Sequence, residues 1–184
     1  MKRIALSLYI ILSTLYLKAG EQYIYTKISN QNGLTSTVNC IYKEKDGAVW
    51  LGTPRGLYSF NGYNIKHFND SLFIGRAVYD IEEDIKGGIW ILTDRWIMHR
   101  KKGEEAFRVI NCTQEKETHS FMSMCQDEEG LWFGGVGCIY RYTYEEERLS
   151  PFCNPGNRYC SIINKVDSST LMCSSSNGSI LVNT

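Results

Sequence analysis

The segment Asp46-Gly-Ala-Val-Trp-Leu-Gly-Thr53 recurs forty residues later as Lys86-Gly-Gly-Ile-Trp-Ile-Leu-Thr93. A third copy runs from Met124 to Gly134 and has one residue fewer between its glycine and its tryptophan. A fourth, degenerate copy begins near Ile162 and carries a leucine where the tryptophan stood. The tryptophans at positions 50, 90 and 132 are 40 and 42 residues apart, and this regular spacing predicts a chain built from repeated structural units.

Each unit has the pattern of four short β-strands. Residues 38–44 alternate in polarity before Asp46-Gly47, a dipeptide that supplies the positive φ of a tight hairpin. Residues 48–53, 57–60 and 63–68 form three further runs, the last two joined by the hairpin dipeptide Asn61-Gly62. Four antiparallel strands within ~40–45 residues are typical of one blade of a β-propeller.

The repeats therefore predict an all-β chain, a β-propeller of four-stranded antiparallel blades. We expect three complete blades at about residues 29–69, 70–110 and 111–152, and a partial fourth blade at 153–184. A lone strand expected at residues 23–28 could complete the fourth blade and close a four-bladed ring. Without that closure the ring is incomplete and leaves strand edges unpaired.

The repeated tryptophans are expected to be structural. At the same position in each unit they would pack between neighbouring blades and bury ~150–250 Å² each. A ligand-binding residue has no need to recur in every blade. We therefore expect Trp50, Trp90 and Trp132 to be blade-packing residues.

The motifs Asn32-Gly-Leu-Thr35, Val38-Asn-Cys-Ile41, Asp46–Thr53 and Gly56-Leu-Tyr-Ser-Phe-Asn-Gly62 closely resemble the two-component regulator propeller repeat. The resemblance covers about residues 22–180 and weakens after the first copy. In that family such repeats form the periplasmic sensor of hybrid two-component systems, usually as two seven-bladed propellers followed by a β-sandwich, a membrane helix and a histidine kinase. Many members respond to oligosaccharides released from polysaccharides.

The resemblance implies an extracytoplasmic ligand-sensing segment of a two-component sensor, responsive to a glycan and not itself an enzyme. Four blades lie at the lower end of the range for propellers, so we expect a truncated fragment that lacks the kinase. An oligosaccharide or another small molecule is the ligand implied for the parent sensor, and homodimerisation stays open. The alternative is a secreted propeller enzyme, a lyase or hydrolase acting on a saccharide or small molecule. Such an enzyme would need a histidine or tyrosine base near a cluster of cations.

The N-terminus has the pattern of an export signal. Met1-Lys-Arg3 is basic, residues 4–17 are almost wholly apolar, and Lys18-Ala-Gly20 ends the run with small residues. An uncleaved anchor is the rival interpretation, but fourteen helical residues reach ~21 Å, less than a ~30 Å hydrocarbon core. We expect a signal peptide at residues 1–20, a mature segment at 21–184 without a further membrane span, and export to the periplasm.

Composition excludes several classes of function. The chain carries 20 basic and 20 acidic residues, which favours neither a nucleic-acid partner nor an anionic membrane. Its seven cysteines include no Cys-x-x-Cys pair and its three histidines lack finger spacing, so we expect no metal and no cofactor. An exported chain could form disulfides, with at least one thiol left over, but the pairing is not readable.

The acidic runs and the histidines do not suggest catalysis. Residues 82–84 and 145–147 are expected to be solvated edges or turns, because neighbouring side chains on a strand point to opposite faces. Residues 127–129 occupy the place of a hairpin turn. His67, His99 and His119 lie at different positions in their blades and are expected on the surface or within strands. We name no catalytic residue.

A ligand site is expected at the turns between the second and third strands of the blades. Arg55 and Arg95 occupy equivalent positions in two such turns, and Asp94 and Trp96 flank the second arginine. An arginine fork and an exposed indole suit an acidic or neutral sugar through hydrogen bonds and stacking. Alternatively, both arginines are ordinary solvated residues, or Arg95 pairs with Asp94.

Overall fold

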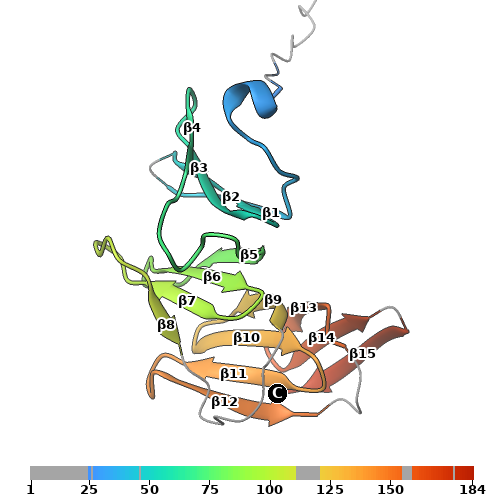
Figure 1. The fold of residues 1–184 in the computed structure, drawn as a ribbon. Helices are drawn as coiled ribbons and strands as arrows, with labels where there is room; N and C mark the ends of the chain where they lie inside the picture. Colours follow the sequence, from blue (N-terminus) through green and yellow to red (C-terminus); the bar gives the residue numbers. More distant parts are fainter. Residues whose placement is uncertain (1–24, 26, 46, 111–120, 155–158, 176) are drawn as a thin grey trace, which may run out of the picture.

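The computed structural model describes residue 25 and residues 27–45, 47–110, 121–154, 159–175 and 177–184 (Figure 1). The expected signal peptide at residues 1–20 lies outside this part of the chain. In the described ranges, no helix is long and apolar enough to cross a membrane. The one helical element there is a short 3-10 turn, η1 (Asn30–Asn32).

The chain folds into four separate antiparallel sheets, each a meander in sequence order. The sheets, named blade 1 to blade 4, have the following strands: β1 (Cys40–Lys43), β2 (Val49–Thr53), β3 (Gly56–Phe60) and β4 (Ile65–His67); β5 (Val78–Glu83), β6 (Ile89–Thr93), β7 (Ile97–Arg100) and β8 (Arg108–Ile110); β9 (Phe121–Gln126), β10 (Gly130–Gly135), β11 (Ile139–Thr143) and β12 (Arg148–Cys153); β13 (Ile162–Asp167), β14 (Thr170–Ser175) and β15 (Gly178–Asn183). The all-β fold class is confirmed, with three four-stranded blades and a three-stranded fourth.

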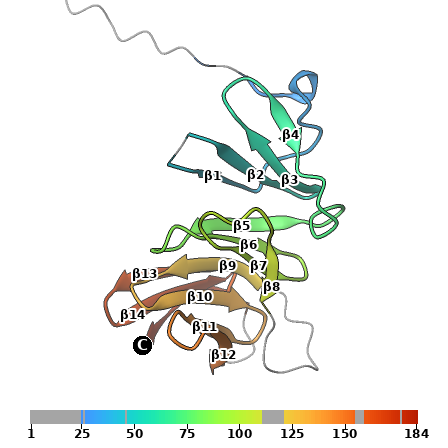
Figure 2. The same cartoon turned by 90° about the vertical axis from the view of Figure 1, so that its left-hand side faces the viewer.

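The sheets form an open series and not a closed ring. Figures 1 and 2 show blade 1 at one end and blades 3 and 4 together at the other. In the described part of the chain, β15 pairs with β14 and with no other strand. Ile28 packs instead against Leu34, Leu51 and Tyr58 on blade 1. Of the segment expected to close the ring, only residues 25, 27 and 28 are described, and none of these three lies in a strand of blade 4.

The hairpin between the first two strands uses glycine in equivalent places. Gly47 has φ 98° in blade 1 and Gly87 has φ 81° in blade 2. Both values lie in the left-handed region that side chains disfavour, which explains why the repeat keeps glycine at this position. Asp84 in blade 2 closes its turn further by accepting hydrogen bonds from the backbone N–H of Lys86 at 2.9 Å and of Gly88 at 2.7 Å.

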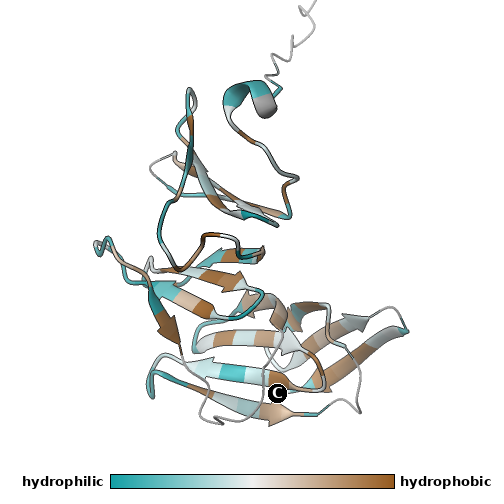
Figure 3. Cartoon of the chain, viewed as in Figure 1, coloured by the Kyte–Doolittle hydropathy of each residue, from teal (hydrophilic) through white to brown (hydrophobic). Residues whose placement is uncertain are grey.

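The hydrophobic core is divided among the junctions between blades. Trp50 clusters with Ile91, Met98 and other residues of blade 2, and Trp90 clusters with Leu131, Phe133 and other residues of blade 3. Trp132 joins a third cluster, mostly of blade 4 residues, that includes Ile163, Leu171 and Cys173. The three indoles are 6%, 0% and 5% exposed, so each repeated tryptophan is buried against the blade that follows its own. Apolar residues are correspondingly frequent along the strands of the inner blades (Figure 3).

Single polar bonds also link the first strands of neighbouring blades. The Asn39 side chain donates to the Val78 carbonyl at 2.9 Å. The Met124 N–H donates to Asp80 at 3.0 Å, and the Ile163 N–H donates to the Ser123 hydroxyl at 3.2 Å. Each of the three junctions thus has one hydrogen bond between a side chain of the preceding blade and a backbone group in the first strand of the following blade, β5, β9 or β13.

One disulfide joins Cys160 to Cys173 within blade 4. Four further cysteines are thiols in the described residues: Cys40, Cys125, Cys138 and Cys153. Cys125 and Cys153 pack against the same cluster as the disulfide. The cysteines of this region therefore serve as small apolar groups as well as a cross-link.

Trp90 supplies the first prediction. Trp90→Ala removes a fully buried indole from the junction between blades 2 and 3. We expect it to lower the free energy of unfolding by about 3–5 kcal/mol, as truncation of a buried aromatic does. Urea unfolding followed by circular dichroism measures this loss. The exposed Tyr63 is the control, since Tyr63→Ala should change stability by less than about 0.5 kcal/mol. Equal effects of the two substitutions would contradict the packing role.

Glu82 on β5 gives the chain a pH-dependent stability. Its position opposite Trp90 in the ladder puts it on the face toward blade 3. Burial, and then the nearby charge of Asp80, raise the pKa of Glu82 from 4.5 to about 7. The folded chain therefore holds a proton that the unfolded chain has lost. This contribution to stability is complete below pH 4.5 and disappears as the pH rises through 7.

In Glu82→Gln, the free energy of unfolding should therefore decrease less between about pH 5 and pH 8 than in the wild type, and the urea midpoint at about pH 8 should be higher. The measurement is a series of urea titrations across that range. Glu105→Gln, a change at an exposed residue, is the matched control. An unchanged pH slope in Glu82→Gln would show that the carboxyl group is not responsible.

Candidate functional site

The two arginine turns have the same local structure. The Thr53 hydroxyl donates to the Gly56 carbonyl at 2.8 Å and accepts from the Arg55 N–H at 3.1 Å. In blade 2 the Thr93 hydroxyl donates to the Trp96 carbonyl at 2.9 Å and accepts from the Arg95 N–H at 3.3 Å. Arg55 and Arg95 are thus equivalent residues of equivalent turns, and both side chains are exposed.

The flanking residues differ from the sequence expectation. Trp96 is half-buried and packs against the cluster around Trp50, while the Arg76 guanidinium lies 4.8 Å from the centre of its ring. It is therefore not an exposed indole, because a partner cation already covers it. The Asp94 N–H donates to the Ala77 carbonyl at 2.9 Å, and within the described residues no ion pair joins Asp94 to Arg95. The cavity described next is lined by none of the four predicted residues.

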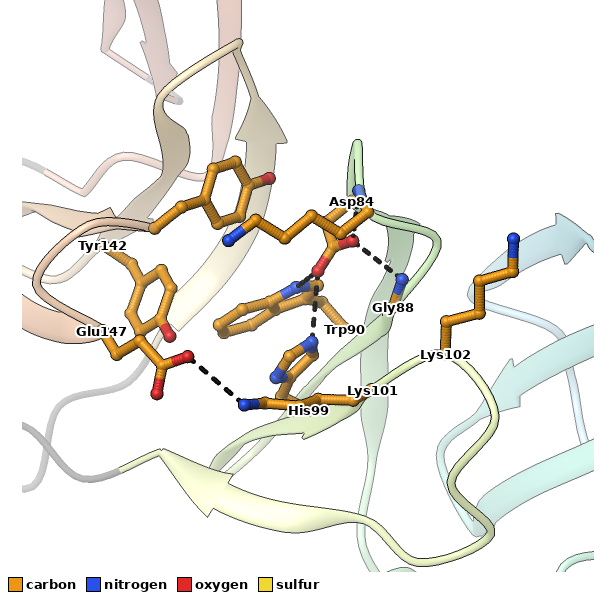
Figure 4. Close-up of a pocket in the computed structure, with 10 residues that line it drawn as sticks. Asp84, Gly88, Trp90, His99, Lys101, Lys102, Tyr142 and Glu147 are labelled. Carbon is orange, nitrogen blue, oxygen red and sulfur yellow. Dashed lines mark hydrogen bonds and ion pairs between the residues drawn. The ribbon is translucent and has the colours of Figure 1, made fainter.

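A cavity of about 250 Å³ lies between blades 2 and 3, at the opposite end of the sheets (Figure 4). Successive turns of an antiparallel meander alternate between the two ends. The β5–β6, β7–β8 and β11–β12 turns therefore share this end, away from Arg95. The cavity is lined by Asp84, Lys86, Gly88, Trp90, His99, Lys101, Lys102, Tyr142, Tyr144 and Glu147.

Asp84 organises the floor of the cavity. One carboxylate oxygen accepts the two backbone N–H groups of its own turn, from Lys86 and Gly88. The other accepts the Trp90 indole N–H at 2.8 Å and contacts His99 Nε2 at 3.1 Å. Burial raises the pKa of Asp84, but the bonds from His99, Trp90 and Gly88 outweigh burial and hold the pKa below its ordinary value.

His99 is held in place by two polar neighbours. Its Nδ1 lies 3.3 Å from the Arg108 guanidinium, which can only donate. Nδ1 is therefore the acceptor, and Nε2 carries the proton that it donates to Asp84. The ring also stacks on Trp90 at 4.1 Å and is 5% exposed. Because both nitrogens are engaged and the ring is buried, His99 is not placed to act as a general base.

Charged and aromatic side chains line the rim. Lys101 Nζ lies 3.3 Å from the Glu147 carboxylate, and this pair joins the β7–β8 turn to the β11–β12 turn. Lys86 Nζ lies 5.2 Å from the centre of the Tyr144 ring. Burial raises the pKa of Tyr144 to about 12, so its hydroxyl is neutral at physiological pH. The site can therefore offer ammonium groups to a ligand, while the Tyr144 hydroxyl is buried within its wall.

The Asp84 arrangement is partly repeated in the other blades. In blade 3 Asp127 accepts the Trp132 indole N–H at 2.8 Å and pairs with Arg141 at 2.7 Å and Lys165 at 3.1 Å. In blade 1 Glu44 occupies the equivalent place, six residues before Trp50, but pairs with Arg100 of blade 2 at 2.6 Å. An acidic residue five or six positions before the tryptophan therefore recurs in the three blades and makes polar contacts in each.

The burial of Asp84 was not expected from the sequence. Residues 82–84 were expected to be solvated edges or turns, and Asp84 lies at the β5–β6 turn but is buried. His99 lies within a strand, β7, which is one of the two places expected for it, and its side chain is buried. The available signal was the spacing of Asp84 and Asp127 from the next tryptophan, six and five residues respectively. In the described ranges, no group of three or more His, Cys, Asp or Glu side chains could hold a metal ion.

Comparison with known proteins identifies the repeat. Residues 32–55 match the family model described as Two component regulator propeller. This segment is similar to the two-component regulator propeller repeat. It runs from η1 through β1 and β2 to the Arg55 turn, the part of the sequence in which the resemblance was strongest. No curated protein matches the chain.

Solved structures confirm the propeller fold. The extracellular domain of the hybrid two component system BT3049 from B. thetaiotaomicron is 16% identical, with a TM-score of 0.74 over 90% of this chain and 24% of that one. The corresponding domain of BT4673 is 19% identical, with a TM-score of 0.65 over 87% and 21%. A streptogramin B lyase is 15% identical, with a TM-score of 0.57 over 81% and 55%. The chain thus spans about a quarter or less of the two sensor domains.

Substitution of Asp84 tests whether its carboxylate organises the floor of the cavity. Asp84→Ala leaves the Trp90 and His99 donors and two backbone N–H groups without their acceptor. We expect the free energy of unfolding to fall by at least about 2 kcal/mol, because buried donors lose their partners. Asp84→Asn retains one acceptor oxygen and should lie between Ala and wild type. Glu145→Ala, at an exposed turn residue, is the control in urea unfolding. If Asp84→Ala is as stable as this control, the carboxylate does not organise the floor.

Proposed function

We propose that this chain is an extracytoplasmic, ligand-sensing β-propeller segment of a two-component signalling sensor, and that its ligand is a saccharide. The observation that carries the proposal is the two-component regulator propeller repeat at residues 32–55. The fold likeness to extracellular domains of hybrid two component systems supports it. On this proposal the chain is exported to the periplasm and contributes one arc of a larger sensor domain.

The cavity between blades 2 and 3 supports ligand binding. Its aromatic walls and its few convergent polar groups are the usual composition of small-molecule sites. It lies at a junction between blades, so a bound ligand would contact two sheets at once. The turns with Arg55, Asp94, Arg95 and Trp96 remain a second proposed place for a ligand, at the other end of the sheets.

The alternative function is a secreted propeller lyase or hydrolase. The likeness to the streptogramin B lyase favours it at the level of fold. The cavity also contains a histidine and two tyrosines near lysines. However, His99 is buried and engaged at both nitrogens, and burial raises the pKa values of Tyr142 and Tyr144. These residues are poorly suited to abstract a proton, so we favour the sensor.

A saccharide panel tests the proposed function. The chain is mixed with neutral and acidic mono- and oligosaccharides, and binding is measured by calorimetry and by the shift in Tm. A ligand at 100 times its Kd should stabilise the fold by about 2.7 kcal/mol. Mass spectrometry of the same mixtures should show the saccharide unchanged. Conversion to products would establish the lyase or hydrolase, and absence of binding to every saccharide would contradict the sensor proposal.

Two sets of variants distinguish the candidate sites. Arg55→Ala with Arg95→Ala removes both exposed turn arginines, and Lys86→Ala with Lys102→Ala removes two lysines of the cavity. The site whose variants weaken binding is the ligand site.

A further inference from the structure

The basic residues of the cavity are specific to blade 2. Lys86 lies in its β5–β6 turn, and Lys101 and Lys102 lie in its β7–β8 turn. The corresponding turns of blade 1 contain Lys45-Asp46-Gly47 and Asn61-Gly62, and those of blade 3 contain runs of glutamate. At the positions equivalent to Lys86, Lys101 and Lys102, blade 1 has Asp46, Asn61 and Gly62, so the repeat folds without lysine at these positions. The lysines of blade 2 are therefore not required by the blade fold and are available for another role.

The Glu147 carboxylate marks the position at which an anion is stabilised. It lies 3.3 Å from Lys101 Nζ. The hydrogen bond from Lys101 comes first among the causes that lower the pKa of Glu147, and the charges of Arg108 and Lys86 add to it. Three cations thus favour a negative charge at the mouth of the cavity between blades 2 and 3, where Figure 4 shows Lys101 in contact with Glu147.

The contact between Lys101 and Glu147 is weak enough to be replaced. Their side chains are 44% and 52% exposed. Ion pairs as exposed as this one contribute about 0–1 kcal/mol, because water and salt screen them. An incoming anion can therefore take the place of Glu147 on Lys101 at little cost in stability.

The balance of charge within the cavity favours such an exchange. Three lysines and two carboxylates line the cavity, namely Lys86, Lys101, Lys102, Asp84 and Glu147, and the Arg108 guanidinium lies 3.3 Å from His99 Nδ1. Asp84 is buried on the floor and both its oxygens are occupied by donors of its own blade. When Glu147 leaves, three lysines remain at the rim against one enclosed carboxylate.

The size and walls of the cavity limit the body of the ligand. A volume of about 250 Å³ is slightly below the range of sites for drug-sized ligands, roughly 300–1,000 Å³. Trp90 has one face on His99 and contacts Tyr142 at 4.6 Å, so it contributes a rigid wall. The tyrosine hydroxyls stay neutral. These dimensions and polar groups suit a single hydroxylated ring.

We propose that the cavity between blades 2 and 3 binds one anionic sugar unit, whose carboxylate or sulfate group displaces Glu147 and binds Lys101 and Lys86. The proposal rests on the proposed function and deepens it, since it names the class of saccharide and the residues that select it. Lys102 widens the basic rim, and Glu147 acts as an internal competitor for the same ammonium group.

The test compares four probes on the whole chain: glucuronate, glucose 6-sulfate, glucose and acetate. Calorimetry at low ionic strength should show binding of one or both anionic sugars and much weaker binding of glucose and acetate. Glu147→Gln removes the competing charge and should tighten the anionic sugar by up to about fivefold, the equivalent of about 1 kcal/mol. Lys101→Met should weaken it by a similar or larger factor.

Glu146→Gln is the matched control, because it removes the same charge from the same turn at a residue that does not line the cavity. It should leave the affinity unchanged. Circular dichroism and Tm establish that each variant is folded before its affinity is compared. Whichever of glucuronate and glucose 6-sulfate binds more tightly identifies the anionic group.

Other results would overturn the proposal. Equal affinity for glucose and glucuronate, or Glu147→Gln indistinguishable from Glu146→Gln, would refute the anionic sugar site while leaving a saccharide sensor intact. Acetate as tight as glucuronate would reduce the cavity to a general anion site and refute the sugar specificity. Failure of every saccharide to bind would refute the proposed function together with this inference.

Discussion

Burial of tryptophan at the junctions between blades is the constraint on which the rest of the structure depends. A single four-stranded sheet has two faces and cannot bury both by itself. Trp50, Trp90 and Trp132 solve this problem in the same way, since each is buried in a cluster with residues of the following blade. The three clusters replace one central core, and the stability of each blade is coupled to that of its neighbours.

The candidate site also depends on the burial of a tryptophan at a junction between blades. An acidic side chain at the β5–β6 turn binds the Trp90 indole N–H, which fixes that turn beside the junction. The β7–β8 and β11–β12 turns meet there, and the cavity lies between them. The fold thus supplies a rigid aromatic and carboxylate floor in blade 2. The residues at the rim can vary without disturbing the packing below them.

The sequence was sufficient for the fold but not for the site. Period, hairpin glycines and tryptophan spacing predicted the four sheets, because these features are local to each repeat. The cavity depends on two blades, and no spacing within one blade shows that Lys101 meets Glu147. Asp84 was judged by residue type as part of a solvated edge or turn, and the strand placement of His99 did not indicate its burial; both side chains are buried through contacts with Trp90. Likewise Trp96 was expected to be exposed, and Arg76, a residue that the turn pattern does not contain, covers it.

The distribution of the indoles has a spectroscopic consequence. Each junction between blades contains one repeated tryptophan in its own surroundings: Trp50 beside phenylalanines, Trp90 stacked on the His99 ring, and Trp132 beneath the Arg141 guanidinium at 4.3 Å. The first junction also contains Trp96, which packs against the cluster around Trp50. Emission from an indole responds to such neighbours and to the entry of water. The molecule therefore carries a separate intrinsic fluorophore at each interface, and single-tryptophan variants would resolve the order in which the blades separate.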